Sequence, residues 1–260
     1  IWWNVLAVHC SHDPRRPLRH VAILSIRPHR VITNDNTSAV MKKFQTIGAK
    51  KIQNHRQLVV ALDHDIQNRE DSNLHKYQAI EGFAKYHGVD FYPAGSGIGH
   101  QIMVERGYVV PGSFVVASDS HSNMYGALGA VGTPIVRTDA AAAWATGDFW
   151  WQIPRSIQVV LEGTLPAGAT GKDIIITLCG LYNHDEVLNS AVEFSGPGVA
   201  SLSMDARFSI SNMSTEWGPL VGWFPVGEAT IKVLHAVKKR LPALGIEPST
   251  ARRLRDRTGN

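Results

Sequence analysis

The chain has 260 residues, 44% of them hydrophobic, and carries a net charge of +4. This length and apolar content suffice for the core of one large domain or two small ones. No apolar run reaches the roughly 18 residues of a membrane span. The two cysteines, Cys10 and Cys179, exclude a disulfide framework and any metal site built from sulfur alone. We therefore expect an intracellular chain without a membrane segment.

Both ends of the chain differ in character from the rest. Residues 1–24 begin without Met and contain arginines but a single acidic residue, Asp13, so they fit either a diverged transit peptide or an extended segment. Residues 241–260 form a basic tail that contains the cluster Arg252 to Arg257. A basic tail without interleaved aromatic residues is more often solvated than bound to nucleic acid, and we expect no nucleic-acid partner.

The first candidate site motif follows a predicted helix and a predicted strand. Asn and Thr caps, apolar residues at helical spacing and a stop at Gly48 predict a helix in the stretch that begins at Thr33. The apolar run Leu58 to Leu62 predicts a buried strand that ends in Asp63 and His64. A histidine flanked by carboxylates at a strand tip suits acid–base chemistry, and a satisfied loop histidine remains the alternative.

Residues 93–126 contain two turns, each of which leads to a histidine. Glycines at 95, 97 and 99 let the backbone approach a ligand closely and predict that His100 lies at a strand-to-helix turn. The apolar, β-branched run Val115 to Ala117 predicts a buried strand. This strand delivers Asp119, Ser120 and His121 at its carboxyl end, where open α/β sheets place their sites.

Strands and helices alternate through this half of the chain. Helical spacing of apolar residues predicts a helix over residues 71–87, and VDFYP predicts a strand over residues 89–93. Each predicted strand ends in a histidine or in Asp-Ser-His, and the carboxyl ends of parallel strands meet at one edge of a sheet. We therefore predict an α/β fold in which three strand tips converge on one site.

The second half of the chain carries weaker signals. Residues 127–147 are predicted as a helix, a turn and a second helix, with Asp139 as an N-cap or first-turn carboxylate. A strand, a Pro/Gly turn and an apolar helix begin at about residue 155 and predict a second subdomain. Further on, Asn212 and Glu216 share one face of a predicted helix, where they are either ligand contacts or part of a solvated face.

These motifs together resemble the aconitase superfamily, and most of all its fungal homoaconitases. The resemblance covers residues 25–225 and rests on four stretches: LDHDIQN, FYPAGSGIGHQIMVERGYVVPGSFVVASDSHSNMYG, GTPIVRTDAAAAWATG and NMSTEWG. It implies α/β/α domains around a 4Fe-4S cluster, and the dehydration and rehydration of a hydroxy tricarboxylate. By position, it assigns active-site roles to His64, His100, Asp119, Ser120, His121, Asn212 and Glu216. It also implies three carboxylate–histidine pairs, Asp63 with His64, Asp119 with His100 and Glu216 with His121, which would orient the rings and raise their basicity.

The sequence departs from the family's pattern in three ways. The cysteine motifs that hold the cluster are absent, so no iron–sulfur cluster is expected from this chain. The swivelling domain, with its substrate-binding arginines and catalytic serine, is also absent. We therefore expect aconitase-like α/β/α layers truncated to the first two domains, residues 25–154 and 155–240. The family's THDN is TNDN here, and we expect substrate contacts from Asn34, Asp35, Asn212 and Ser96.

Three functional hypotheses follow. The first is a cluster-free lyase, isomerase or cyclase, cytoplasmic or mitochondrial, that uses its histidines and carboxylates on a small carboxylate or natural-product substrate. In that enzyme one divalent metal, zinc or ferrous iron, could be held by His64, His100, His121 and Asp119. The second is a non-catalytic binding or structural subunit, whose exposed tryptophans mediate self-association or partner binding: Trp144, Trp150, Trp151, Trp217 and Trp223. The third is an enzyme whose missing domains come from another chain.

Overall fold

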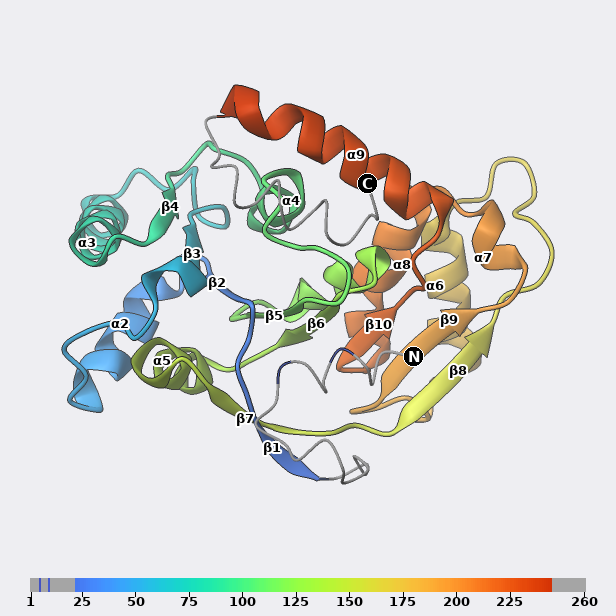
Figure 1. Cartoon of the computed structure of the whole chain (residues 1–260), viewed down its shortest axis with the longest axis horizontal. Coiled ribbons are helices and arrows are strands. Elements are labelled where there is room, and N and C mark those ends of the chain that lie inside the picture. The colour runs from blue at the N-terminus through green and yellow to red at the C-terminus, as the bar shows by residue number, and fades with distance from the viewer. Residues whose placement is uncertain (1–4, 6–8, 10–21, 245–260) are drawn as a thin grey trace.

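A five-stranded parallel sheet forms the centre of the chain (Figure 1). The computed structural model describes residues 5, 9 and 22–244. The strands lie in the order β4-β3-β2-β5-β6, and every neighbouring pair is parallel. Their bounds are β2 Arg30–Thr33, β3 Leu58–Ala61, β4 Asp90–Tyr92, β5 Phe114–Ala117 and β6 Val131–Pro134. The predicted α/β fold is therefore confirmed.

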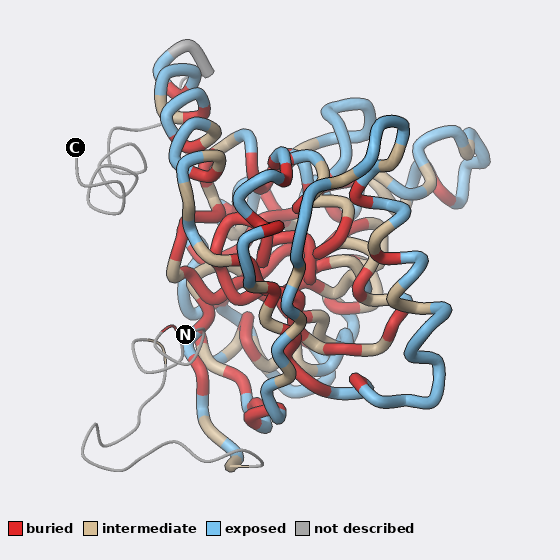
Figure 2. Tube along the Cα trace, turned by 90° about the vertical axis from the view of Figure 1, so that its right-hand side faces the viewer, coloured by how far each residue is buried: buried red, intermediate tan, exposed pale blue. Residues whose placement is uncertain are grey.

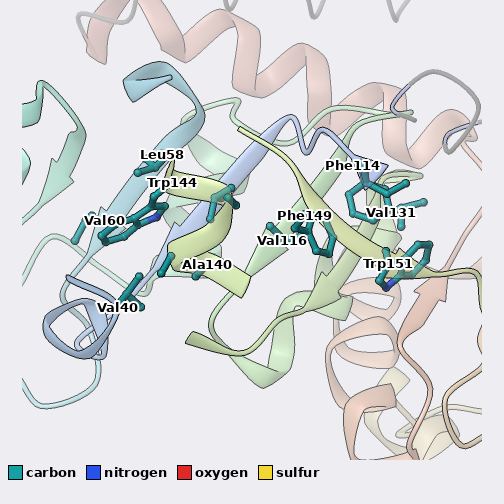
Figure 3. Close-up of a cluster of buried hydrophobic side chains, with 14 of the residues drawn as sticks. Val40, Leu58, Val60, Phe114, Val116, Val131, Ala140, Trp144, Phe149 and Trp151 are labelled. Carbon is teal, nitrogen blue, oxygen red and sulfur yellow. The ribbon is translucent and has the colours of Figure 1, made fainter. Parts of the chain in front are cut away.

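Helices cover both faces of this sheet, because consecutive strand residues point to opposite sides. One apolar cluster joins Val31, Val60 and Val116 to the helices α2 (Thr37–Thr46), α3 (Asp71–His87) and α5 (Arg137–Thr146), as the close-up in Figure 3 shows in part. The alternate residues of the same strands face a second cluster, formed with α4 (Gly99–Glu105), η2 (Ser120–Leu128) and α9 (Glu228–Arg240). Burial on both faces explains the continuous apolar runs of these strands.

Two smaller sheets complete the described fold. The parallel sheet β10-β9-β8 consists of β8 (Ser156–Val160), β9 (Ala191–Ser195) and β10 (Val221–Trp223). Its helices are α6 (Gly171–Leu181), α7 (Gly198–Ser201) and α8 (Met204–Trp217). An antiparallel pair joins β1 (Ile23–Ile26) to β7 (Phe149–Gln152). Two short 3-10 helices cover His55–Gln57 (η1) and Leu241–Leu244 (η3).

A close backbone contact joins the large sheet's layer to the second sheet. A Cβ at Gly126 in η2 would lie 1.8 Å from the carbonyl oxygen of Gly222 in β10. A Cβ at Gly222 would in turn lie 2.5 Å from Oγ of Ser214 in α8. Only glycine fits either position, and the contact brings α8 beside η2. This packing places Glu216 near His121.

The structure corrects two predicted features of secondary structure. Residues 127–147 do not form helix, turn and helix, because β6 occupies Val131–Pro134 between η2 and α5. The small residues in this stretch serve close packing, since a Cβ at Gly132 would lie 2.9 Å from Cβ of Tyr125. The helix α9 lies over Glu228–Arg240, a stretch for which no element was predicted. Asp139 does lie in the first turn of α5, as expected.

The expectation of an exposed tryptophan surface is largely wrong for the residues described here. Of the five tryptophans named above, only Trp150 is exposed, at 58%. Trp144 is buried among the helices on one face of the large sheet, and Trp151, Trp217 and Trp223 are also buried. Figure 2 colours the buried residues of the chain in red. These four side chains pack within the described part of the chain and do not form an exposed surface.

Candidate active site

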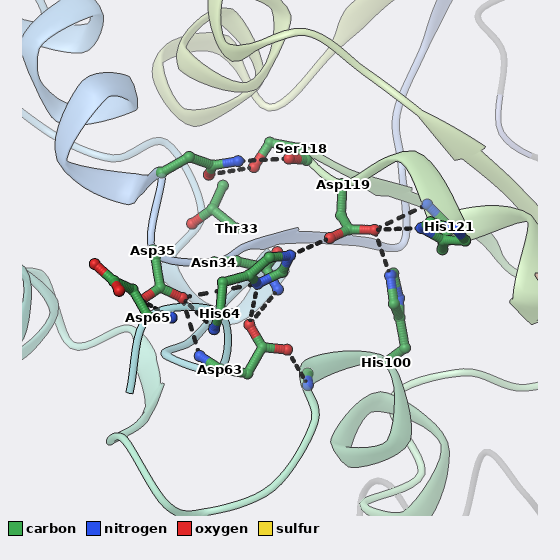
Figure 4. Close-up of polar contacts among 12 residues, drawn as sticks. Thr33, Asn34, Asp35, Asp63, His64, Asp65, His100, Ser118, Asp119 and His121 are labelled. Atoms are coloured by element: carbon green, nitrogen blue, oxygen red, sulfur yellow. Dashed lines mark hydrogen bonds and ion pairs between the residues drawn. The ribbon is translucent and has the colours of Figure 1, made fainter. Parts of the chain in front are cut away.

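The predicted strand tips converge around Asp119, which follows β5 (Figure 4). Nε2 of His100 donates a hydrogen bond to Oδ1 of Asp119 over 2.8 Å, and the backbone N–H of His121 donates to the same oxygen over 2.8 Å. The other oxygen, Oδ2, forms an ion pair with Nε2 of His64 at 3.1 Å. Three histidines from three separate segments therefore surround one carboxylate.

Asp119 stays ionised because its contacts outweigh its burial. Burial raises the pKa of the Asp119 carboxyl, but hydrogen bonds from His100 and from the backbone N–H of His121, together with the charge of His64, hold that pKa well below its usual range. An ionised carboxylate accepts hydrogen bonds and donates none. The two ring nitrogens in close contact with Asp119, Nε2 of His100 at 2.8 Å and Nε2 of His64 at 3.1 Å, must therefore each carry a proton to make a favourable contact.

His64 lies between two carboxylates. Its Nδ1 forms a hydrogen bond of 2.7 Å with Oδ1 of Asp63, while Nε2 faces Asp119. Desolvation lowers the pKa of His64, but the hydrogen bond and charge of Asp63 and the charges of Asp119 and Asp35 raise it above its ordinary value overall. The side chain is still 57% exposed. The contacts with two carboxylates thus favour the imidazolium form of His64, in a position that solvent or a ligand can reach.

Asp63 connects the His64 tip to helix α4. Its Oδ2 accepts a hydrogen bond of 2.5 Å from the backbone N–H of Gly99, and its Oδ1 accepts one of 2.8 Å from Nδ2 of Asn34. A Cβ at Gly99 would lie 3.0 Å from Oδ2 of Asp63 and 3.1 Å from Nδ2 of Asn34. Glycine at this position therefore lets the Asp63 carboxylate approach the start of α4. The requirement for glycine here comes from this close approach and not from a positive φ angle.

Asp35 fixes the backbone of the turn after β3, which carries Asp63 and His64. Its Oδ2 accepts the backbone N–H groups of Asp63 (3.0 Å) and His64 (2.8 Å), and its Oδ1 accepts the hydroxyl of Tyr77. Burial raises the pKa of Asp35, but these hydrogen bonds lower it overall. We predicted substrate contacts from Asn34 and Asp35. In the structure both side chains form internal hydrogen bonds, and Asn34 is only 2% exposed.

His100 is held on both sides and is buried. Besides Nε2 on Asp119, its Nδ1 forms a hydrogen bond of 2.7 Å with the hydroxyl of Tyr125 in η2. The side chain of His100 is 8% exposed. Sequence reasoning missed Tyr125, because a tyrosine in a small-residue stretch carries no sign of a polar partner.

His121 forms the third side of the site, nearer to the surface. Its Nδ1 forms a hydrogen bond of 3.1 Å with Oγ of Ser120, and its Nε2 lies 3.3 Å from Oε1 of Glu216. The three predicted carboxylate–histidine pairs are therefore all in contact. Asn212 is half-buried on α8, one turn before Glu216. Ser96 lies in an exposed turn, where its backbone N–H donates to the carbonyl of Pro93.

The proposed four-ligand metal set does not come together as predicted. Asp119 contacts His64 and His100, but no three of His64, His100, His121 and Asp119 place a ligand atom each within 4.8 Å of one another. Within the described residues, Asp35, Asp63 and His64 alone satisfy that distance. The Asp35 carboxylate already accepts backbone N–H groups, and the Asp63 carboxylate accepts a hydrogen bond from Nδ1 of His64, so these contacts account for the arrangement.

The thiols of this sequence do not fit an iron–sulfur cluster, which needs three or four thiolates. The sequence contains two cysteines. Cys10 lies outside the described residues, and Cys179 is half-buried on α6. Burial raises the pKa of the Cys179 thiol, which disfavours the thiolate form that binds metals.

Comparison with known proteins shows the family of the chain. The sequence model of the aconitase family (aconitate hydratase) matches residues 4–254. The chain belongs to the aconitase family. Relatives in the family include the mitochondrial homoaconitases of Mycosarcoma maydis, 60% identical over 208 residues, and of Yarrowia lipolytica, 58% identical over 219 residues. The homoaconitase of Chaetomium globosum is 55% identical over 233 residues.

These family members are much longer than the part that matches. The aligned regions cover 80%, 84% and 89% of this chain but 28%, 32% and 29% of the three relatives, in the same order. The chain therefore spans about a third or less of the homoaconitases that it resembles. Across residues 22–244, no helix has both the length and the apolar character that crossing a bilayer requires.

Proposed function

We propose that this chain carries the acid–base site of a hydro-lyase or isomerase that acts on a small carboxylate, of the hydroxy-tricarboxylate class implied by its homoaconitase relatives. The observation that supports this proposal is the pairing of an exposed, charged His64 with a second histidine, His121, around one ionised carboxylate, Asp119. The names of these relatives also support a mitochondrial location.

His64 is suited to donate a proton to a leaving hydroxyl group. Its Nδ1 is held by Asp63 at 2.7 Å, whereas its Nε2 has the longer contact, 3.1 Å to Asp119. The Nε2–H is therefore the proton that a ligand oxygen can share. The positive charge of the ring also attracts a substrate carboxylate.

His121 is suited to the opposite proton transfer. Glu216 faces its Nε2, which favours a proton on that nitrogen and leaves Nδ1 as the base, in contact with Ser120. Nδ1 of His121 and Nε2 of His64 lie 3.8 Å and 3.1 Å from oxygens of the same Asp119 carboxylate, so one small substrate can reach both. Elimination then moves the carbon-bound proton to His121, while the hydroxyl leaves as water with the proton from His64.

The proposal is tested by exchange of the carbon-bound proton. A hydroxy tricarboxylate is incubated with the protein in D₂O, and loss of its proton NMR signal is followed. This measurement detects proton abstraction even where elimination is slow. We expect exchange above the rate in buffer, and a loss of about 10²- to 10⁴-fold in His121→Asn, the typical contribution of a positioned acid or base.

His75→Asn is the matched control, because His75 is exposed on α3. This variant should exchange protons at the wild-type rate. Wild-type exchange no faster than in buffer would overturn the proposal, as would equal rates in the wild type and His121→Asn. Binding without exchange, seen as shifts of the His64 ring signals, would indicate a binding subunit instead.

A further inference from the structure

Tyr125 contacts the site through a hydrogen bond to His100. Its side chain is fully buried, and its hydroxyl forms a hydrogen bond of 2.7 Å with Nδ1 of His100. The two rings meet edge to face, with their centroids 5.3 Å apart. Among the residues that the structure describes, the hydroxyl has no second hydrogen-bond partner. The phenol therefore serves His100 only.

Only one protonation form of the His100 ring gives every donor and acceptor around it a partner. The ionised Asp119 carboxylate accepts, so Nε2 carries a proton. If Nδ1 also carried one, it would donate to the Tyr125 oxygen, and the phenol hydrogen would be left unpaired inside the core. A bare Nδ1 accepts the phenol hydrogen instead, and every group is then satisfied. The matched form is the neutral imidazole with its proton on Nε2.

We infer that Tyr125 is a positioning residue that locks His100 as the neutral Nε2–H tautomer, so that His100 orients Asp119 and does not itself exchange protons with substrate. The role of His100 in catalysis rests on the proposed function. The tautomer of its ring does not, and it can be measured without substrate. His100 would then act as the fixed donor to one oxygen of Asp119, leaving the other oxygen for His64.

The surroundings of Tyr125 fix the ring in this place. Gly132 on β6 lies against it, and a Cβ there would be 2.9 Å from Cβ and 3.1 Å from Cδ2 of Tyr125. The ring also belongs to the apolar cluster on the α4 face of the sheet, with Ile102 and Met103. Burial raises the pKa of the Tyr125 hydroxyl well above its usual value, so the phenol keeps its hydrogen.

Nitrogen NMR of the histidine rings tests the inference without substrate. The whole chain is labelled with ¹⁵N-histidine, and the His100 signals are assigned as those lost in His100→Asn. In the wild type we expect a protonated Nε2 and a bare Nδ1 whose shift shows an accepted hydrogen bond. In Tyr125→Phe that hydrogen-bond shift should disappear, while His64 keeps two protonated nitrogens.

Tyr92→Phe is the matched control, because it removes a hydroxyl that bonds to Tyr108 and not to a histidine. It should leave the His100 signals unchanged. A doubly protonated His100 or the Nδ1–H tautomer in the wild type would overturn the inference, and so would an unchanged Nδ1 shift in Tyr125→Phe. The expected tautomer without proton exchange in the assay above would leave this inference standing and refute the proposed function.

Discussion

His64 and His100 bind opposite oxygens of the same carboxylate and yet differ in charge and accessibility. His64, after β3, has Asp63 on its second nitrogen and is 57% exposed. His100, in α4, has Tyr125 on its second nitrogen and is 8% exposed. A carboxylate as second partner favours imidazolium, whereas a phenol allows the neutral ring. For these two histidines, the partner on the far nitrogen therefore separates a ring suited to donate a proton from one suited to act as a fixed support.

The substitution Asp119→Asn should have the largest effect on stability, because His64 and His100 both lose their shared carboxylate acceptor. Removing one partner of a buried ion pair costs about 3–5 kcal/mol of unfolding free energy, which urea denaturation measures. The pKa of Asp119 is lowered, so its contribution is present above its unfolded value of 3.8 and is lost as pH falls through the folded value. The difference between the variant and the wild type should therefore shrink in acid.

Asp205→Asn is the control for this measurement, because Asp205 is exposed in the first turn of α8. Its effect should be a few tenths of a kcal/mol. An Asp119→Asn variant as stable as Asp205→Asn would show that the carboxylate does not hold the histidines together.

Gly99→Ala should loosen the connection between the two histidines. The new methyl group would press on Asp63, which holds His64, at the start of the helix that carries His100. Overpacking of this kind costs about 1–3 kcal/mol. The matched control is Gly82→Ala in α3, where a methyl group meets nothing within 4 Å and should stabilise by about 0.5–1 kcal/mol. Stabilisation by both variants would contradict the close approach of Asp63.

His64→Asn should remove the ion pairs of His64 with Asp63 and Asp119 and leave the contact of His100 with Asp119 in place. The pKa of His64 is raised in the folded state, so its ion pairs stabilise fully below the unfolded value of about 6.5, and this contribution is lost as pH rises through the folded pKa. The ring is more than half exposed, so we expect about 1 kcal/mol or less. Unfolding measured from pH 5 to 9 should show the difference from wild type decreasing with pH. A difference that increases with pH would mean that the folded ring is neutral.

Glu216→Gln should have the smallest effect on stability and leave His64 and His100 as they are. Glu216 is 62% exposed and its ion pair with His121 spans 3.3 Å, so we expect a loss of about 0.5 kcal/mol or less. Ring ¹⁵N signals of His121 should move while those of His100 stay. Movement of the His100 signals would show that the three histidines respond as one unit.

Sequence patterns predicted that these side chains lie close together, because the residues follow strands, and the structure brings them into contact. The apolar runs before Asp63 and Asp119 predicted parallel strands, and parallel strands end at a shared edge. The resemblance to the aconitase superfamily then supplied the pairings, all three of which the structure brings into contact. The sequence did not predict that the Asp35 carboxylate binds the backbone of the next strand tip. Local sequence does not show which hydrogen-bond donors a fold will bring to a side chain.

The sequence by itself determined the alternation of strands and helices and the placement of histidines and carboxylates at the strand tips. Both follow from short-range patterns of apolar residues, glycines and caps. Tertiary structure alone decided which nitrogen of each histidine meets which partner, and so which ring carries a charge. That choice depends on contacts between residues far apart in the chain, such as Tyr125 with His100 and Glu216 with His121. Packing of η2 against β6 and α8 creates these contacts, and no local pattern encodes them.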